Sequence, residues 1–233
     1  MNAICLFNCS VIGNVLLPGS LSIKTPRGTI ASTLSCGVGQ ISSETPEKIA
    51  KLSTHSHIGI WDNELMHAEL LQMQYQPVIP AHMQVAYSWA YLWRIKAKKN
   101  LPSLILDCFF IPNTAVASTD IQTGEGLYAI CAFFEEDSVY IGTEDEDFLY
   151  QRAEVNKSLP FRYAKEKLFD CSHQPLLSSN EHNIHINFPP PQREEIVQLQ
   201  FVVAGGRDAT SNWFAVEANP RDILSQAGCD ESF

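Results

Sequence analysis

The sequence predicts an α+β fold, in which a largely antiparallel β-sheet carries helices packed mainly on one side. Apolar runs of strand length, bounded by turn residues, occur near the start of the chain and again in its second half. Between them lie two longer segments with the apolar spacing of helices. Strands and helices do not alternate regularly, which argues against a doubly wound parallel sheet.

Length and composition favour one folded domain. The chain has 233 residues, of which 45% are hydrophobic and 18% are charged, and these values fit a globular protein with a sizeable core. The polar, proline-rich stretch 172–192 is the one candidate boundary. The part that follows it is short for an independent domain, so we expect a single domain over residues 1–233.

The expected strands follow short apolar or alternating runs with turn residues between them. Residues 20–36 predict two strands around a Pro-Arg-Gly turn, and residues 126–134 and 137–143 predict a hairpin. The N-terminal stretch 1–20 lacks a basic residue ahead of its apolar run, so two short strands are expected there rather than a signal peptide. Further strands are expected at 57–61, 103–111, 183–188, 195–205 and 212–218.

The expected helices rest on capping signals and on apolar spacing. Thr45 and Pro46 would open a helix over 45–52, and Pro220 and Gly228 would bracket one over 221–228. Apolar residues at helical spacing or all round predict further helices over 64–74 and 81–99. Acidic residues open a last helical region over 144–170, which Pro160 interrupts.

The charge balance limits the classes of partner. The net charge is −10, which disfavours nucleic acid and leaves a basic protein as the partner that charge alone would favour. No stretch approaches 18 continuous apolar residues, so no membrane association is expected. The oligomeric state stays open.

Seven cysteines are present, with no C-x-x-C pair, and most of them lie in apolar surroundings. This usage is typical of reduced, packed thiols and indicates a cytoplasmic location. Cys108 lies inside an apolar run, so we expect core packing rather than a nucleophile.

A cluster of histidines suggests a metal site. Zinc or iron could be held by His55, His57, Asp62 and His67 if these side chains converge, because imidazole and carboxylate groups suit both metals. The spacing completes no known metal motif, so the alternative is a helix capped by Asp62 beside ordinary polar histidines. His57 and Asp62 also match H-x-x-x-x-D of some acyltransferases, without the accompanying phosphate motif.

Two acidic runs form the other candidate site. A basic partner could bind Glu135, Glu136, Asp137, Glu144, Asp145 and Asp147. The simpler interpretation is a solvated hairpin tip followed by a helix start. Glycines at 205–206 and 124–126 are expected in hairpin turns rather than in a phosphate-binding loop, because no helix is expected after either pair.

Two functions from different classes are compatible with these features. The first is an intracellular acidic module that binds or regulates another protein, since no complete catalytic set is evident. The alternative is a metal-assisted hydrolase or other enzyme that uses the four-residue histidine cluster. A short sequence motif is not required for the second function, because active sites often assemble from distant residues.

Overall fold

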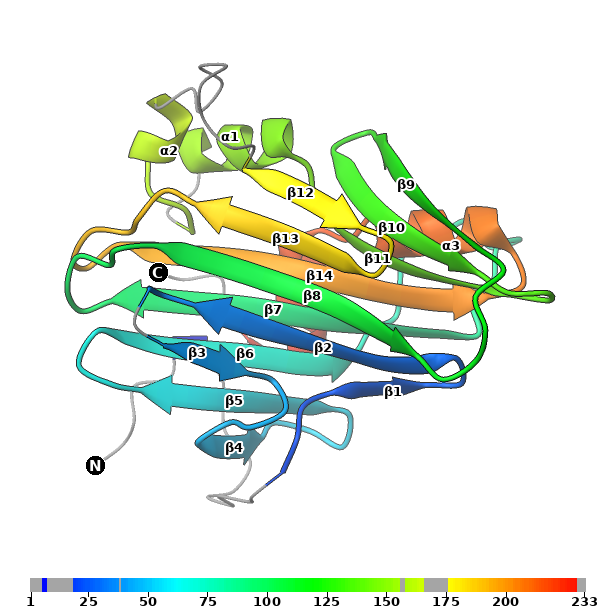
Figure 1. Cartoon of the computed structure of the whole chain (residues 1–233), viewed down its shortest axis with the longest axis horizontal. Coiled ribbons are helices and arrows are strands. Elements are labelled where there is room, and N and C mark those ends of the chain that lie inside the picture. Colours follow the sequence, from blue (N-terminus) through cyan, green and yellow to red (C-terminus); the bar gives the residue numbers. More distant parts are fainter. Residues whose placement is uncertain (1–5, 8–18, 38, 156–157, 166–175, 230–233) are drawn as a thin grey trace.

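Two antiparallel β-sheets lie face to face in a computed structural model of the chain (Figure 1). The structure describes residues 6–7, 19–37, 39–155, 158–165 and 176–229. The predicted α+β class is therefore wrong, because strands dominate and the few short helices do not cover one side of a single sheet. The N-terminal strands expected within 1–20 fall almost wholly outside the described residues.

The smaller sheet has six strands. Its order is β1 (Ile23–Thr25), β2 (Gly28–Ser35), β8 (Leu104–Pro112), β13 (Asn183–Phe188) and β12 (Leu177–Asn180), and β3 (Gln40–Ser42) also pairs with β2. The predicted turn at Pro26-Arg27 joins β1 to β2, with Thr25 paired to Gly28. The predicted strand over 183–188 is confirmed, and it lies inside the sheet between β8 and β12.

The larger sheet has eight strands, all antiparallel to their neighbours. Its order is β4 (Lys48–Lys51), β5 (Ser56–Asp62), β6 (Met66–Gln74), β7 (Tyr87–Ala97), β14 (Ile196–Gly206), β11 (Ser138–Glu144), β10 (Leu127–Phe133) and β9 (Ser118–Gly124). The predicted hairpin of β10 and β11 is confirmed, with Phe133 paired to Ser138.

Apolar side chains from both sheets fill the space between them. Trp93 of β7 is fully buried, and its ring centre lies 5.2 Å from that of Trp61 on β5, with the two rings tilted by 33°. Its indole nitrogen donates to the Ser32 hydroxyl of β2 at 2.8 Å. Ser32 in turn donates to the carbonyl of Asp107 on β8. The indole of Trp93 and the hydroxyl of Ser32 are therefore both hydrogen-bonded within the core, as is usual for buried polar groups.

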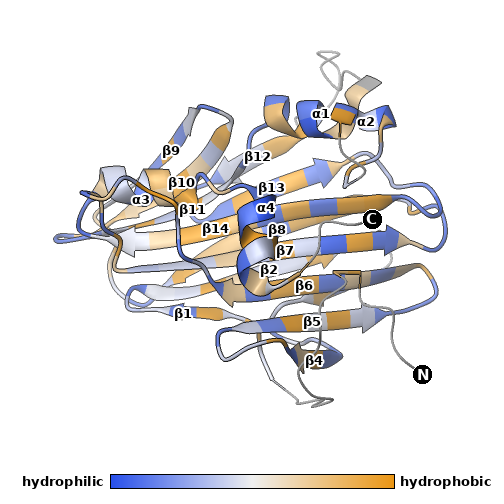
Figure 2. Ribbon diagram, turned by 180° about the vertical axis from the view of Figure 1, so that it is seen from behind, coloured by the Kyte–Doolittle hydropathy of each residue, from blue (hydrophilic) through white to orange (hydrophobic). Residues whose placement is uncertain are grey.

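A second apolar layer covers the outer face of the larger sheet. It contains Leu92, Val202 and Ala204 from the strands, together with Ile223 and Leu224 from a helix. This helix, α4 (Pro220–Ala227), crosses the back of the sheet, and α3 (Ala209–Val216) packs on β14 and β11 (Figure 2). The larger sheet is therefore covered on both faces over much of its area.

The double covering explains why two expected helices are strands. Residues 81–99 contain β7, whose Tyr91 and Trp93 face the other sheet while Ala90 and Leu92 face the second layer. A strand that is apolar on both faces loses its alternation and resembles a buried helix. The helix expected over 64–74 is β6 for the same reason, and the helix expected over 45–52 gives way to β4.

The predictions for the C-terminal helix and for the helical region around Pro160 agree with the structure. Helices α1 (Glu146–Val155) and α2 (Arg162–Lys165) close one end of the core, where Leu149 and Tyr163 are buried, and they flank Pro160 as predicted. Helix α4 begins at Pro220 and ends at Gly228, whose φ of +68° needs the conformational freedom of glycine, so this prediction is confirmed.

The strand expected over 212–218 is wrong. Gly205 and Gly206 end β14, no hairpin forms, and helix α3 begins directly afterwards. The carboxylate of Asp208 caps this helix by accepting from the Thr210 amide at 3.1 Å. That carboxylate already occupies the helix N-terminus, where an anion would otherwise bind.

Candidate functional site

The strand register separates the four residues of the predicted metal site. Asp62 of β5 pairs with His67 of β6, whereas His57 lies at the other end of the same strand pair, opposite Gln72. Five residues of strand correspond to about 17 Å. His55 precedes β5 at the His57 end, where its carbonyl accepts from Gln74. The structure therefore brings Asp62 and His67 together, at 2.9 Å, and places the other two histidines elsewhere.

The described part of the chain contains no group of three or more His, Cys, Asp or Glu side chains that could hold a metal ion. His57 is partly buried, and this burial, together with the charge of Lys51, lowers its pKa. The zinc or iron hypothesis gains no support from this geometry.

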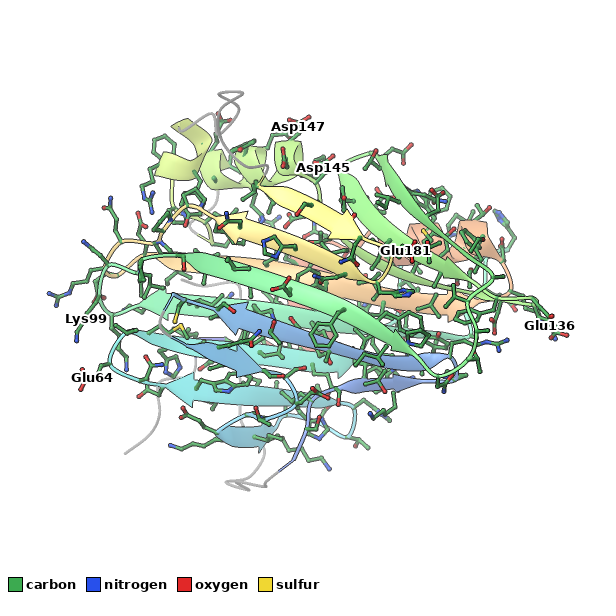
Figure 3. The ribbon with its side chains drawn as sticks, viewed as in Figure 1. Glu64, Lys99, Glu136, Asp145, Asp147 and Glu181 are labelled. Carbon is green, nitrogen blue, oxygen red and sulfur yellow. The ribbon has the colours of Figure 1, made fainter. Side chains whose placement is uncertain are left out.

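The six acidic residues of the predicted partner surface fall into two separate groups, and Figure 3 shows Glu136 far from Asp145 and Asp147. Glu135, Glu136 and Asp137 sit at the β10–β11 turn, where Asp137 forms a 2.7 Å ion pair with Arg27. Asp145 is at the opposite end of β11 and accepts from the Phe148 amide at the start of α1. The length of β11 thus divides the predicted surface into two patches, each with a structural role as a hairpin tip or a helix cap.

Glu144 is not on the surface at all. It is 8% exposed and accepts two hydrogen bonds from the guanidinium of Arg152 on α1, at 2.9 and 2.8 Å. Arg152 also donates to the Ser158 hydroxyl and to the Gln198 carbonyl. This pair joins α1 to β11 and β14 and forms one wall of a cavity.

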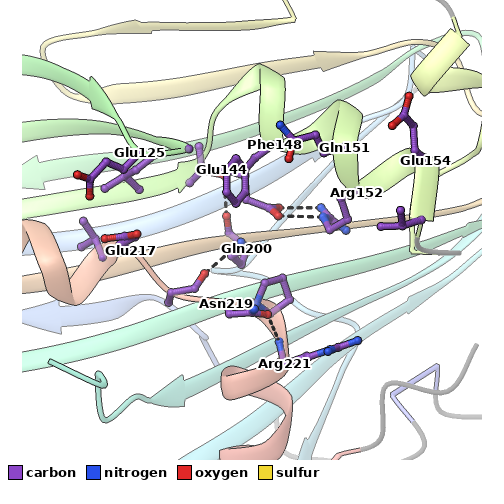
Figure 4. Close-up of a pocket in the computed structure, with 17 residues that line it drawn as sticks. Glu125, Glu144, Phe148, Gln151, Arg152, Glu154, Gln200, Glu217, Asn219 and Arg221 are labelled. Carbon is purple, nitrogen blue, oxygen red and sulfur yellow. Dashed lines mark hydrogen bonds and ion pairs between the residues drawn. The ribbon is translucent and has the colours of Figure 1, made fainter.

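The cavity has a volume of about 600 Å³ and lies on the outer side of the larger sheet (Figure 4). Three segments surround it, namely α1, the β9–β10 turn and the connection between α3 and α4. Such a volume is within the range of small-molecule sites. Its polar lining residues are Glu125, Thr143, Glu144, Gln151, Arg152, Glu154, Gln200, Glu217, Asn219 and Arg221.

A partly exposed phenylalanine is the one aromatic residue among those that line the cavity. Phe148 on α1 is 47% exposed, and its ring lies over Gly126, where an added Cβ atom would approach the ring to 2.4 Å. Glu125 and Gly126 both have positive φ, of 55° and 85°, as a two-residue hairpin turn of this kind requires. The predicted turn at 124–126 is therefore confirmed, and glycine is needed there for both conformation and space.

Gln200 of β14 lines the cavity from the sheet side. It is 2% exposed, and its amide nitrogen donates to the Ala218 carbonyl at 3.4 Å. A carbonyl only accepts, so this contact fixes which end of the amide is nitrogen. The amide oxygen at the other end has no hydrogen-bond partner, which is unusual for a buried polar atom.

Two further carboxylates line the cavity, Glu125 in the β9–β10 turn and Glu217 in the connection between α3 and α4. Partial burial raises the pKa of Glu217, and the negative charge of Glu125 raises it further. Next to Glu217, Asn219 caps α4 by accepting from the Arg221 amide at 2.9 Å. Acidic, amide and guanidinium groups therefore surround one phenyl ring in Figure 4.

Among the residues that line the cavity, the sequence predicts a binding role only for Glu144, and predicts it as part of a surface. The other lining residues come from the β9–β10 turn, β11, α1, β14 and the α3–α4 connection, so no short motif connects them. One local signal was present: Gln198 and Gln200 are two amides on one face of an otherwise apolar strand. Buried polar residues in such a strand indicate either a network or a site.

The described cysteines are of two kinds. Cys36, Cys108 and Cys131 carry free thiols, and burial raises the pKa of Cys108 strongly, which agrees with core packing. Cys229 is disulfide-bonded, contrary to the expectation that the cysteines are reduced. No helix within the described ranges is long and apolar enough to cross a membrane.

Comparison with known proteins gives likenesses of structure at low sequence identity. No known protein family and no curated protein matches the sequence. A candidate kojibiose phosphorylase from human microbiome aligns with 95% of this chain at a TM-score of 0.49 and 6% identity, and a polysaccharide lyase aligns with 86% at 0.35 and 11%. The chain spans about a third of the length of each, 33% and 28% respectively.

Proposed function

We propose that this chain binds a small polyhydroxylated molecule, such as a mono- or disaccharide, in the cavity between α1 and the α3–α4 connection. The observation that carries the proposal is the lining of this cavity, where the half-exposed ring of Phe148 lies among amide, carboxylate and guanidinium groups. A sugar offers an apolar face for the ring and hydroxyl groups that both donate and accept hydrogen bonds.

Gln200 supports a ligand that donates hydrogen bonds. Its unpaired amide oxygen lies beside the cavity, and rotation about the terminal side-chain torsion, which is soft, would turn it toward a bound hydroxyl group. A buried acceptor without a partner costs about 1–3 kcal/mol in the empty protein. Ligand binding would recover part of that cost.

The charges favour a neutral ligand over an anion. Arg152 already neutralises Glu144 through two hydrogen bonds, whereas Glu125 and Glu217 repel each other and would repel a carboxylate or phosphate. A cationic amine is the competing ligand class, because acidic groups beside an aromatic ring also suit an ammonium group.

Titration calorimetry with a panel of neutral mono- and disaccharides, aliphatic amines and sugar phosphates tests the proposal. We expect heat of binding with a subset of neutral sugars and none with the phosphates. Binding should weaken at least tenfold in Phe148→Ala, which removes the ring. Phe161→Ala is the matched control, because Phe161 is 57% exposed and lies outside the cavity. Binding of amines and of no sugar would contradict the proposal and would favour a cationic ligand instead.

The sequence-based hypotheses remain separate predictions. A role in binding or regulating a basic protein would now use the patch at the β10–β11 turn or the one at the start of α1, not both together. A cytoplasmic location also stays a prediction, and the disulfide at Cys229 weighs against it, because such bonds are rare in reducing compartments.

A further inference from the structure

Two buried charged side chains hold the backbone of residues 6 and 7 against the larger sheet. The Glu69 carboxylate on β6 accepts from the amides of Leu6, at 2.9 Å, and Phe7, at 3.3 Å. Arg94 on β7 is the register partner of Glu69, donates to the Leu6 carbonyl, and lies 4.6 Å from the centre of the Phe7 ring. Phe7, Glu69 and Arg94 are all 0% exposed. We name Leu6, Phe7, Glu69 and Arg94 together the N-terminal clamp.

One imidazole connects the clamp to the protein surface. His67 Nε2 lies 3.0 Å from Glu69 Oε1, and Nδ1 lies 2.9 Å from Asp62 Oδ1. An ionised carboxylate only accepts hydrogen bonds, and a neutral imidazole has one N–H group. Both contacts are therefore hydrogen bonds only when the ring is the doubly protonated imidazolium.

We propose that His67 is a pH-sensitive switch of the N-terminal clamp: the imidazolium holds Glu69 where it binds the amides of Leu6 and Phe7, and loss of a ring proton loosens that grip. Deprotonation leaves one ring nitrogen as an acceptor facing a carboxylate oxygen. The two acceptors repel, so Glu69 or Asp62 must shift.

The charged groups around His67 come from three strands and favour its protonated form overall. Asp62 at the end of β5 and Glu69 on β6 are the two negative neighbours. On β7, Lys98 binds Asp62 at 2.6 Å, Lys96 is the register partner of His67 but pairs with Glu194, and Arg94 stands beside Glu69.

The pKa of His67 is raised, first by its hydrogen bond to Glu69 and also by Asp62, against the opposing effect of burial. A raised pKa means that the imidazolium is more stable in the folded protein than in the unfolded chain. The contribution to the clamp is therefore complete below about pH 6.5 and is lost as the pH rises through the pKa of folded His67.

Amide hydrogen exchange measured by NMR between pH 5 and 9 tests the switch in the full chain. The readout is the protection factor of the Leu6 and Phe7 amides relative to that of Trp93, a core amide of β7 that reports global opening. We expect this ratio to fall about tenfold as His67 deprotonates, the size expected for losing one charge-assisted hydrogen bond. In His67→Gln, which cannot titrate, the ratio should stay flat over the same range.

The matched control is His57→Gln, because His57 lies at the far end of the same strand pair. This variant should keep the wild-type fall in the protection ratio. An unchanged fall in His67→Gln would overturn the proposal. Should His67→Gln not fold, titration of the imidazole Cε1–H signals of the wild-type protein decides: His67 must titrate above 6.5, and a midpoint at or below that value refutes the switch.

Discussion

Glu144 and Arg152 meet through two parallel hydrogen bonds, of 2.9 and 2.8 Å, and each side chain is only 10% exposed. The carboxylate ends β11 and the guanidinium belongs to the last turn of α1. This paired geometry fixes the helix that carries Phe148, so the wall of the cavity depends on it. Removing one partner of such a pair leaves the other charge buried without compensation.

Glu144→Ala should therefore lower the free energy of unfolding by about 3–5 kcal/mol, measured by urea denaturation. The control is Glu136→Ala, because Glu136 makes only a 3.5 Å contact with Arg207 and both side chains are more than 70% exposed. An exposed pair is worth about 0–1 kcal/mol. Equal effects of the two substitutions would show that burial of the Glu144 pair has no energetic consequence.

Gln200→Leu should separate stability from binding. The substitution removes a buried amide oxygen that has no partner and a weak 3.4 Å hydrogen bond to Ala218, and it keeps the volume approximately. We expect the empty protein to keep its stability or to gain about 1 kcal/mol, since the unpaired acceptor is eliminated. Sugar binding should weaken at least tenfold in calorimetry.

The opposite result would be informative. A purely structural Gln200 would make Gln200→Leu less stable by thermal unfolding and leave the affinity of the folded protein unchanged. Gln122→Leu, at a partly exposed position on β9 outside the cavity, is the control for adding leucine to this sheet.

Local signals in the sequence predicted some of the turns and caps correctly. The structure has the predicted turns at Glu125-Gly126 and at Glu135–Asp137, and the predicted helix that begins at Pro220 and ends at Gly228. Each of these features depends on the backbone preferences of a few residues. Other local signals were overridden by tertiary structure: no helix begins at Thr45 and Pro46, and Gly205 and Gly206 end β14 without a hairpin turn.

The two sheets could not be recognised because the outer face of the larger one is also covered. Leu92 and Trp93 of β7 point to opposite faces and are both fully buried, so the segment carries no period-2 pattern. Asp62 and His67, which the metal hypothesis placed at the start of a helix, are register partners on two strands.

The cavity was missed for a different reason. Its floor and walls combine Gly126, Glu144, Gln200 and Glu217, which are brought together by strand order and by the path of α3 and α4. The sequence separation between a residue on β11 and one on β14 does not show that they are neighbours, because the pairing of these two strands cannot be read from the sequence. The site is thus a property of topology rather than of a motif.

Gly126→Ala should destabilise the protein more than Gly228→Ala. Both glycines have positive φ, of 85° and 68°, so alanine is strained at either position. At Gly228 the added Cβ meets nothing within 4 Å, whereas at Gly126 it would lie 2.4 Å from the Phe148 ring. We expect a loss of about 1 kcal/mol at Gly228 and a clearly larger loss at Gly126 by urea denaturation.

The difference between the two glycine variants isolates the contact with Phe148. It should shrink in the double variant Gly126→Ala with Phe148→Ala, because the ring that causes the clash is gone. An unchanged difference would mean that the turn conformation alone, and not the ring packed on it, requires glycine at position 126.

Glu217 should make the stability of the protein depend on acid pH in a direction opposite to that of a salt-bridged carboxylate. Its pKa is raised in the folded protein by partial burial and by Glu125, so folding disfavours its ionised form. Its contribution is therefore fully present below the unfolded pKa and is lost as the pH rises through the folded pKa. Glu217→Gln, which stays neutral, should gain thermal stability relative to wild type between about pH 4 and 6.

Asp62→Asn is the control and should show the opposite trend, because the hydrogen bond from Lys98 lowers the pKa of Asp62. The thermal stability of the wild type should therefore rise relative to that of this variant as the pH rises. Parallel curves for Glu217→Gln and wild type across this range would mean that neither burial nor Glu125 perturbs the carboxyl group at this edge of the cavity.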